Sequence, residues 1–273
     1  MTVTKEEVDR LTQWTRDYLE KAVPQGRFQA IVGLSGGIDS AVIAALCVQA
    51  VGADKVHGVI MPCDSDPVDG MLAERLASNF GIGCTIVDLE ETFHRWWADY
   101  RSTFYTDTRL NRMIPANAKA RLRMLTLYAE AARFGGLVIG TTNKTEAILG
   151  YATKYGDSGV DIEPLMSFYK KEIYELANLL NEPRGHIPGR GTMIPQPIIN
   201  RKPTAGLWEG QTDEGELEMS YDRIDAVLME HGIEKLCIQV VSGEAKAPDV
   251  IKIVKLYRAN LHKDFHLPHY PRG

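Results

Sequence analysis

Residues 35 to 40, with the sequence Ser-Gly-Gly-Ile-Asp-Ser, combine residue types that can bind phosphate. The apolar residues before this string predict a buried strand, and those after it predict a helix. A glycine pair lets the backbone approach a ligand closely, and the free amides at a helix N-terminus attract an anion. Ser35 and Ser40 add hydroxyl donors, and the Asp39 carboxylate can hold Mg²⁺ between phosphates. The string predicts a phosphate-binding turn, the simpler alternative being a tight turn capped by Asp39 and Ser40.

A second group of polar residues follows the predicted strand from Leu137 to Thr141. Ligands of open α/β sheets bind beyond the carboxyl ends of the strands. We therefore expect Thr141 and Glu146 to face the same crevice as Ser35 and Asp39. This arrangement would place two carboxylates over one phosphate site.

Two later segments carry charged residues that also suggest a ligand. The loop 154–161 contains two aspartates and two glycines, a composition that is equally typical of an ordinary turn. The predicted helix 168–180 begins with Lys170 and Lys171, whose positive charges oppose the helix dipole. A nearby phosphate would explain these lysines.

Short apolar strands alternate with amphipathic helices along the chain. Strands are predicted at residues 28–34, 55–61, 82–89 and 137–141, and helices at 4–23, 41–46, 66–80, 90–104, 117–134, 168–180, 220–228 and 247–261. This alternation predicts an α/β fold with a doubly wound, mainly parallel sheet flanked by helices.

The chain is expected to form a single domain over residues 1–273. Residues 181–215 are rich in Pro and Gly and lack clear periodicity, which is typical of a mobile lid or a partner-binding loop. Disorder without a role is the alternative for this loop. A helical segment is expected to complete the chain at residues 220–273.

The composition excludes several classes of protein. A net charge of −5 and a pI near 5.8 argue against nucleic acid as the main partner. The four cysteines lack the spacing of a zinc site or a redox pair. Neither a signal peptide nor a run of eighteen apolar residues is present, which predicts a cytoplasmic protein without membrane contact.

The glycine turn differs from the two commonest nucleotide-binding motifs. No Lys-Ser or Lys-Thr follows it, as a Walker A loop requires, and Gly-x-Gly-x-x-Gly is also absent. The string instead resembles the pyrophosphate loop of the ATP pyrophosphatases, a superfamily that includes NAD synthetases, GMP and asparagine synthetases and tRNA-thiolating enzymes. Its members bind pyrophosphate in this turn and activate a substrate oxygen by adenylation.

Later stretches are similar to motifs of the NAD synthetases, namely residues 117–124, 140–146, 154–161 and 202–214. The resemblance extends from about Tyr18 to the C-terminal tail. It implies an adenine-nucleotide α-hydrolase-like fold and an ammonia-dependent ligase that converts deamido-NAD, ATP and ammonia into NAD, AMP and pyrophosphate through adenylated deamido-NAD. It also implies Mg²⁺ and a homodimer with the substrate site at the interface.

The same resemblance implies roles for individual residues. Asp39 and Glu146 would hold Mg²⁺. The ATP-binding positions would be Ser35, Gly36, Gly37, Ile38, Asp39, Ser40, Met61, Thr141, Lys170 and Thr204. The deamido-NAD-binding positions would be Tyr18, Arg123, Tyr151, Lys154, Asp157, Asp161, His262 and Lys263, with Arg123 reaching the substrate of the partner subunit.

Three residues are expected to act in catalysis. The Asp157 and Asp161 carboxylates would attract ammonium and accept its proton. Lys170 would neutralise the charge that develops at the α-phosphorus.

The chain departs from the family pattern at the end of the second strand. Many bacterial members have an arginine by the adenine there, whereas this chain reads Val-Ile-Met-Pro at 59–62, so Met61 and backbone groups are expected to recognise adenine. Only about thirty residues precede the turn, so no glutaminase domain is expected and free ammonia is the expected nitrogen source.

The sequence leaves two alternative functions open. An RNA-modifying member of the superfamily would adenylate a base, but it should carry a catalytic cysteine pair or an RNA-binding domain. A noncatalytic adenine-nucleotide sensor would keep the turn for binding alone, and it would have little need for Glu146, Lys154, Lys170 and the Asp157 loop together.

Overall fold

A four-stranded parallel sheet forms the centre of the molecule. The computed structural model describes residues 2–22, 29–102, 112–182, 194–208, 210–263 and 267–272. The strands are β1 (Ala30–Gly33), β2 (Val56–Ile60), β3 (Gly83–Ile86) and β4 (Leu137–Ile139), in the order β3-β2-β1-β4. In register, Ala30 pairs with Val56 of β2 and with Leu137 of β4. The predicted parallel α/β sheet is confirmed.

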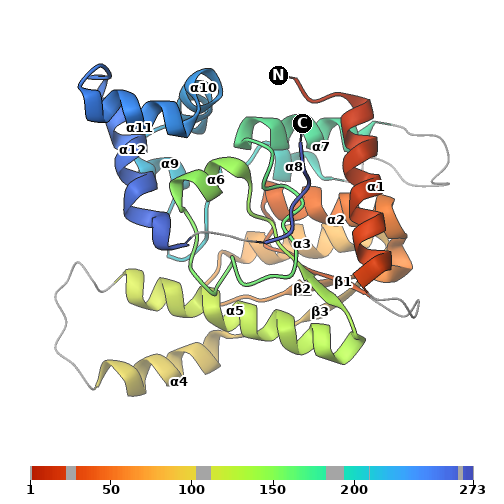
Figure 1. The fold of residues 1–273 in the computed structure, drawn as a ribbon. Helices are drawn as coiled ribbons and strands as arrows, with labels where there is room; N and C mark the ends of the chain where they lie inside the picture. Colours follow the sequence, from red (N-terminus) through yellow and green to blue (C-terminus); the bar gives the residue numbers. More distant parts are fainter. Residues whose placement is uncertain are drawn as a thin grey trace.

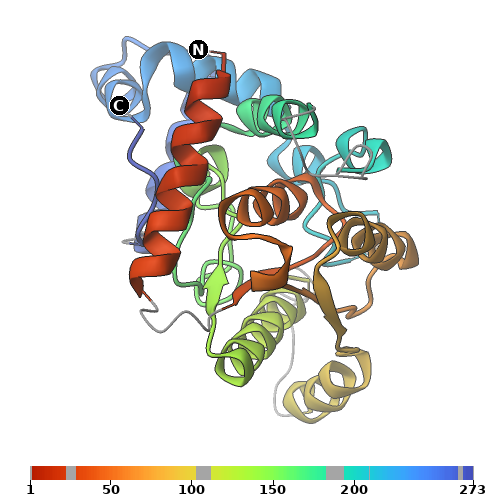
Figure 2. The same ribbon diagram turned by 90° about the vertical axis from the view of Figure 1, so that its right-hand side faces the viewer.

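Helices cover both faces of this sheet (Figures 1 and 2). Successive side chains of a strand point to opposite faces. Ala30 and Val32 therefore lie in the core that includes α2 (Ile38–Val51), while Ile31 packs with α5 (Met113–Phe134) on the other face. The helices preceding the C-terminal group are α1 (Lys5–Ala22), α2 (Ile38–Val51), α3 (Pro67–Phe80), α4 (Glu90–Arg101), α5 (Met113–Phe134), α6 (Lys144–Leu149), α7 (Lys170–Asn181) and α8 (Gln196–Ile199).

Helix α2 is apolar around its whole circumference because it is enclosed on all sides. Its residues from Ala41 to Cys47 are fully buried against the sheet, α1 and α7. The helix that follows the glycine turn is thereby held rigidly, with its N-terminus at the carboxyl end of β1.

A second, smaller core holds the C-terminal helices together at one side of the sheet (Figure 1). These helices are α9 (Asp213–Leu217), α10 (Tyr221–His231), α11 (Ile233–Ser242) and α12 (Pro248–Asn260). Leu149 at the end of α6 packs into this core and joins it to the sheet.

Two single-residue bridges continue the sheet beyond β4. Ile139 pairs with Ile162, and Glu163 pairs with His269 of the C-terminal tail. The tail is fastened further by Arg272, which forms ion pairs with Glu172 of α7 at 2.6 Å and with Glu7 of α1.

The observed elements differ from the predicted ones mainly in number. Helix α5 begins at Met113 rather than 117, and the short helices α6, α8 and α9 and the amphipathic α11 were not predicted. Part of the predicted loop 181–215 forms α8 and the start of α9, while residues 183–193 lie outside the described residues. No helix in the described part of the chain is long and apolar enough to cross a membrane.

Candidate active site

The glycine turn brings its hydroxyls and amides to the N-terminus of α2. Gly36 has a φ of +75°, and a Cβ at this position would lie 2.6 Å from the backbone oxygen of Asp69, so only glycine fits. The Ser35 and Ser40 hydroxyls lie 3.2 Å apart, and Ser40 Oγ donates to the Gly37 carbonyl at 2.9 Å. The turn thus forms a concave set of donors suited to an anion.

Lys170 lies between two carboxylates at the edge of this turn. Its Nζ is 2.6 Å from Asp39 Oδ2 and 3.1 Å from Glu146 Oε1, and its side chain is 2% exposed. Burial alone would lower the pKa of Lys170, but the two carboxylates raise it. The lysine is therefore a permanent cation, and its pairing explains a positive charge at the start of α7.

Asn143 connects the two carboxylates directly. Its Nδ2 donates to Asp39 Oδ1 at 3.0 Å, and its Oδ1 accepts the Glu146 amide at 3.0 Å. The Glu146 side chain in turn accepts the Asn143 amide at 3.2 Å, completing a capping box on α6. Burial raises the pKa of Glu146, and the Asp39 charge adds to this effect although Lys170 opposes it.

A cavity of about 1010 Å³ opens above the turn. Every predicted ATP-binding and metal-holding residue lines it, and so do six of the eight predicted deamido-NAD positions: Arg123, Tyr151, Lys154, Asp157, His262 and Lys263. The structure therefore brings together residues from the glycine turn, the loop 154–161 and the tail.

Two predicted positions, Tyr18 and Asp161, lie outside this lining. Tyr18 packs on the α1 face of the core with its ring centroid 5.8 Å from that of Trp14. The Asp161 carboxylate accepts the Val138 amide at 2.7 Å and the Tyr128 hydroxyl at 3.2 Å. These contacts stabilise the edge of β4, so any role of Asp161 in catalysis remains a prediction.

The chain matches a family model described as NAD synthase over residues 7–266. It is 41% identical over 225 residues to the NH(3)-dependent NAD(+) synthetase of Finegoldia magna, covering 82% of this chain and 84% of that protein. The chain belongs to the NAD synthase family.

Among solved structures, it is similar to an NMN synthetase from Francisella tularensis, with a TM-score of 0.74, 30% identity, and 97% and 99% of the two chains covered. It is also similar to an NH3-dependent NAD synthetase from Campylobacter jejuni, with a TM-score of 0.67, 28% identity, and 97% and 99% of the two chains covered.

In this NAD synthase family member, the loop 154–161 and the tail meet at one end of the cavity. Lys154 Nζ donates to the His262 carbonyl at 2.7 Å, and Lys263 Nζ donates to the Gly150 carbonyl at 2.8 Å. The Asp157 side chain is accessible and accepts the Thr153 amide at 2.7 Å. Enclosure by the surrounding protein nevertheless raises its pKa.

Sequence reasoning assigned no role to three residues in a hydrogen-bonded group with Tyr151, namely Asp213, Glu216 and Tyr221. The Tyr151 hydroxyl donates to Glu216 at 2.8 Å and to Asp213 at 3.2 Å, and Tyr221 donates to Asp213 at 3.1 Å. Burial raises the pKa of Asp213. The stretch 202–214, which is similar to an NAD synthetase motif, includes Asp213 and could have pointed to these residues.

Arg123 lies in the cavity of its own chain. Its Nε donates to the Met61 carbonyl and its Nη2 to the Ser65 hydroxyl, both at 3.2 Å. Burial lowers its pKa, while nearby acidic groups oppose this effect. A guanidinium thus stands beside Met61, where sequence reasoning had expected the backbone and Met61 alone.

Residues 201–208 form a strap over the turn. Arg201 forms ion pairs with Asp66 at 3.5 Å and with Asp69 of α3. Thr204 is held within the strap, since its hydroxyl donates to the Gln211 carbonyl at 2.8 Å. Because Asp69 abuts Gly36, this pairing connects the strap to the turn.

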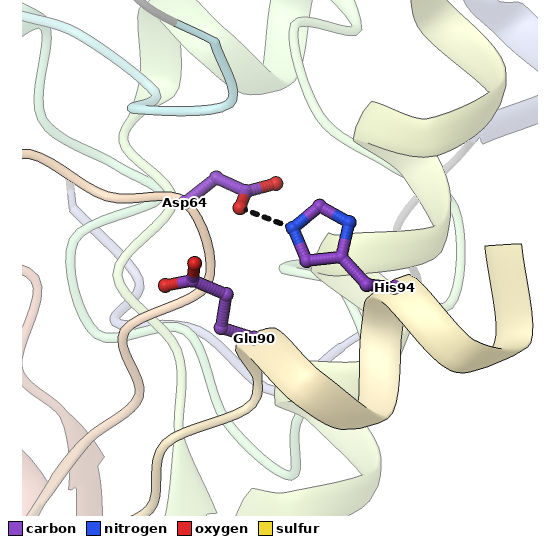
Figure 3. Close-up of side chains that lie close together, drawn as sticks. All are labelled: Asp64, Glu90 and His94. Carbon is purple, nitrogen blue, oxygen red and sulfur yellow. Dashed lines mark hydrogen bonds and ion pairs between the residues drawn. The ribbon is translucent and has the colours of Figure 1, made fainter. Parts of the chain in front are cut away.

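Glu90 and His94 of α4 form a further polar group with Asp64, which lies on the loop after β2 (Figure 3). One ligand atom from each lies within 4.8 Å of the others. Asp64 already uses both oxygens, one with His94 Nε2 at 2.7 Å and one with Lys119 Nζ at 2.7 Å. Lys119 also donates to the Leu207 carbonyl at 3.3 Å, so this group joins α4 and α5 to the strap.

Proposed function

We propose that the protein converts deamido-NAD, ATP and ammonia into NAD, AMP and pyrophosphate. The observation that supports this best is the Lys170 cation held between Asp39 and Glu146 at the N-terminus of α2. The amides and hydroxyls of the turn suit the phosphates, and the rest of the cavity has room for a second nucleotide. A sensor would need no such convergent charges.

The residues around the turn also suit Mg²⁺. Asp39 and Glu146 supply hard oxygen donors, and a divalent cation beside them would favour the ionised form of Glu146, whose pKa is raised by burial and by the Asp39 charge. When bound, Mg²⁺ would neutralise charge on the ATP phosphates. We propose Asp39 and Glu146 as the residues that hold it.

The reaction would proceed in two steps. The nicotinate carboxylate attacks the α-phosphorus of ATP, the bond to the bridging oxygen breaks, and pyrophosphate leaves into the glycine turn. Lys170 stabilises the charge that develops during this step. Ammonia then attacks the acyl carbon, AMP leaves, and Asp157 accepts the proton that ammonium or the amine loses.

Substrate identity, assembly and location are proposed from separate observations. The neighbour named as an NMN synthetase makes the mononucleotide the second candidate acid. A homodimer, and deamido-NAD bound across its interface, agree with the exposed apolar residues Trp96, Tyr100 and Leu125 on α4 and α5. We also propose a cytoplasmic location, in agreement with four free cysteines.

One assay tests the proposed function. Purified protein with Mg²⁺, ATP and ammonium is supplied with deamido-NAD, with nicotinate mononucleotide, or with neither acid. We expect pyrophosphate release and NAD formation only with deamido-NAD. Release that does not depend on either acid would contradict the proposal, and a preference for the mononucleotide would reassign the substrate.

A further inference from the structure

A carboxyl group with no predicted role lies directly behind the proposed ATP site. Glu163 is 0% exposed and lies between β4 and the C-terminal tail. Its amide donates to the Pro268 carbonyl at 2.9 Å. No cation from the described residues forms an ion pair with it. Burial raises the pKa of Glu163, the hydrogen bonds with Thr142 oppose this effect, and the Asp157 and Glu146 charges add to it.

The Glu163 carboxyl fills a space that depends on Gly140. A Cβ at position 140 would lie 2.3 Å from the Glu163 carboxyl carbon. The Thr142 amide donates to Glu163 Oε2 at 2.9 Å, and the Thr142 hydroxyl lies 2.7 Å from Oε1. One side chain thereby satisfies both polar groups of a buried threonine.

These contacts fix a turn that carries active-site residues on both sides of Thr142. Thr141 lines the cavity, and Asn143 contacts both Asp39 and Glu146. Because the turn is short, a shift of Thr142 would move Thr141 and Asn143 together. Glu163 therefore acts on the site through the backbone, without contacting a substrate.

We propose that Glu163 is a positioning residue that holds the turn from Gly140 to Asn143 in its neutral, protonated form. The role at ATP rests on the function proposed above. A buried carboxylate without a cation is costly, so the neutral acid is the favoured form. In that form the Oε1 hydroxyl donates to the Thr142 hydroxyl oxygen across the 2.7 Å contact, and Oε2 accepts the Thr142 amide.

Two substitutions test which property of the Glu163 side chain the turn requires: the hydrogen bonds of a neutral acid, the charge of a carboxylate, or only the volume of the side chain. Glu163→Gln reproduces the protonated acid, since its carbonyl can accept the Thr142 amide and its NH₂ can donate to the hydroxyl. We expect it to keep the wild-type kcat and the KM for ATP. Glu163→Leu leaves two buried polar groups unpaired, the Thr142 amide and the Thr142 hydroxyl, and we expect kcat/KM for ATP to fall about 5- to 150-fold while the KM for deamido-NAD changes little.

A second pair of variants distinguishes a loss of ATP binding from a general loss of stability. Thr142→Val removes only the hydroxyl, and it should weaken ATP use even if Glu163→Leu does not fold. Leu165→Ala, at a fully buried residue of the same segment, should lower thermal stability without changing the KM for ATP.

ATP binding measured by calorimetry without the second substrate keeps this inference separate from the proposed function. Wild-type protein that binds ATP but forms no NAD would overturn the function, and the variants would still report on Glu163. The inference is overturned if Glu163→Gln loses ATP affinity as Glu163→Leu does, because an ionised carboxylate would then be required. It is equally overturned if Glu163→Leu and Thr142→Val bind ATP normally, or if every variant weakens both substrates alike.

Discussion

The Lys170 ammonium lies 2.6 Å from the Asp39 carboxylate, although 131 positions separate the two residues in the chain. Asp39 stands in the first turn of α2, and Lys170 is the first residue of α7. These two helices pack side by side on one face of the sheet, so their N-termini meet in the wall of the cavity. Helix packing therefore places a cation and a carboxylate at the proposed pyrophosphate site.

Asp39→Asn is predicted to abolish most turnover while the protein stays folded. The substitution keeps the size of the side chain but removes the charge that pairs with Lys170 and that would hold Mg²⁺. We expect kcat to fall about 10²- to 10³-fold, as for loss of one preorganised electrostatic contact. Pyrophosphate release measures this effect, and Asp54→Asn, at an exposed carboxylate remote from the cavity, is the control. Full activity of Asp39→Asn would remove Asp39 from the site.

Lys170→Met is predicted to destabilise the protein in a manner that Mg²⁺ partly corrects. Without the ammonium, Asp39 and Glu146 face each other unpaired. We expect the free energy of unfolding to fall by about 2–4 kcal/mol. This loss is somewhat smaller than the cost of breaking a fully buried ion pair, because both carboxylates face the cavity. Urea denaturation with and without Mg²⁺ tests this. An equal response of wild type and variant to Mg²⁺ would argue against a shared cation site.

The sequence allowed the glycine turn and the fold to be predicted because both depend on local patterns. Apolar runs and their spacing identify parallel strands, and the carboxyl ends of parallel strands meet at one edge of the sheet. That rule alone placed Thr141 and Glu146 in one crevice with Ser35 and Asp39, as the structure has them.

Contacts between distant segments could not be read in this way. The partners of Lys170 and the proximity of Arg123 to Met61 depend on how whole helices pack. Glu163 gave no signal at all, because a lone glutamate is ordinarily exposed. Helix α11, which lies between Gly232 and Gly243, was also not predicted.

Arg201→Asp is predicted to weaken ATP binding, and Asp69→Arg is predicted to restore part of it. Arg201 ties the strap to Asp69, whose backbone lies against Gly36. An aspartate at position 201 should be repelled by Asp69 and move the strap away from the turn. We expect the KM for ATP to rise by the equivalent of about 1–3 kcal/mol, a value between the free energies of exposed and buried ion pairs. Steady-state kinetics of the two single variants and the double variant form a mutant cycle. Additive effects would mean that the ion pair does not position the strap.

His57 is predicted to make the folded protein less stable as the pH falls. The ring is 8% exposed, its Nε2 lies 2.7 Å from the Thr85 hydroxyl, and its centroid lies 4.3 Å from that of Phe134. Burial lowers the pKa of His57, although the Glu130 carboxylate partly opposes this. The unfolded chain therefore binds a proton more readily than the folded one, and stability is lost as the pH falls from about 6.5 through the folded-state pKa.

Urea unfolding of wild type and His57→Gln between pH 8 and pH 5 isolates this contribution from that of other titrating groups. Glutamine keeps a polar side chain of similar reach but does not titrate. We expect the stability advantage of the wild type to shrink steadily toward pH 5, because only the wild type must keep a histidine neutral at that pH. An advantage that stays constant or grows toward pH 5 would mean that the Glu130 charge outweighs burial and that the folded protein binds the proton more tightly than the unfolded chain.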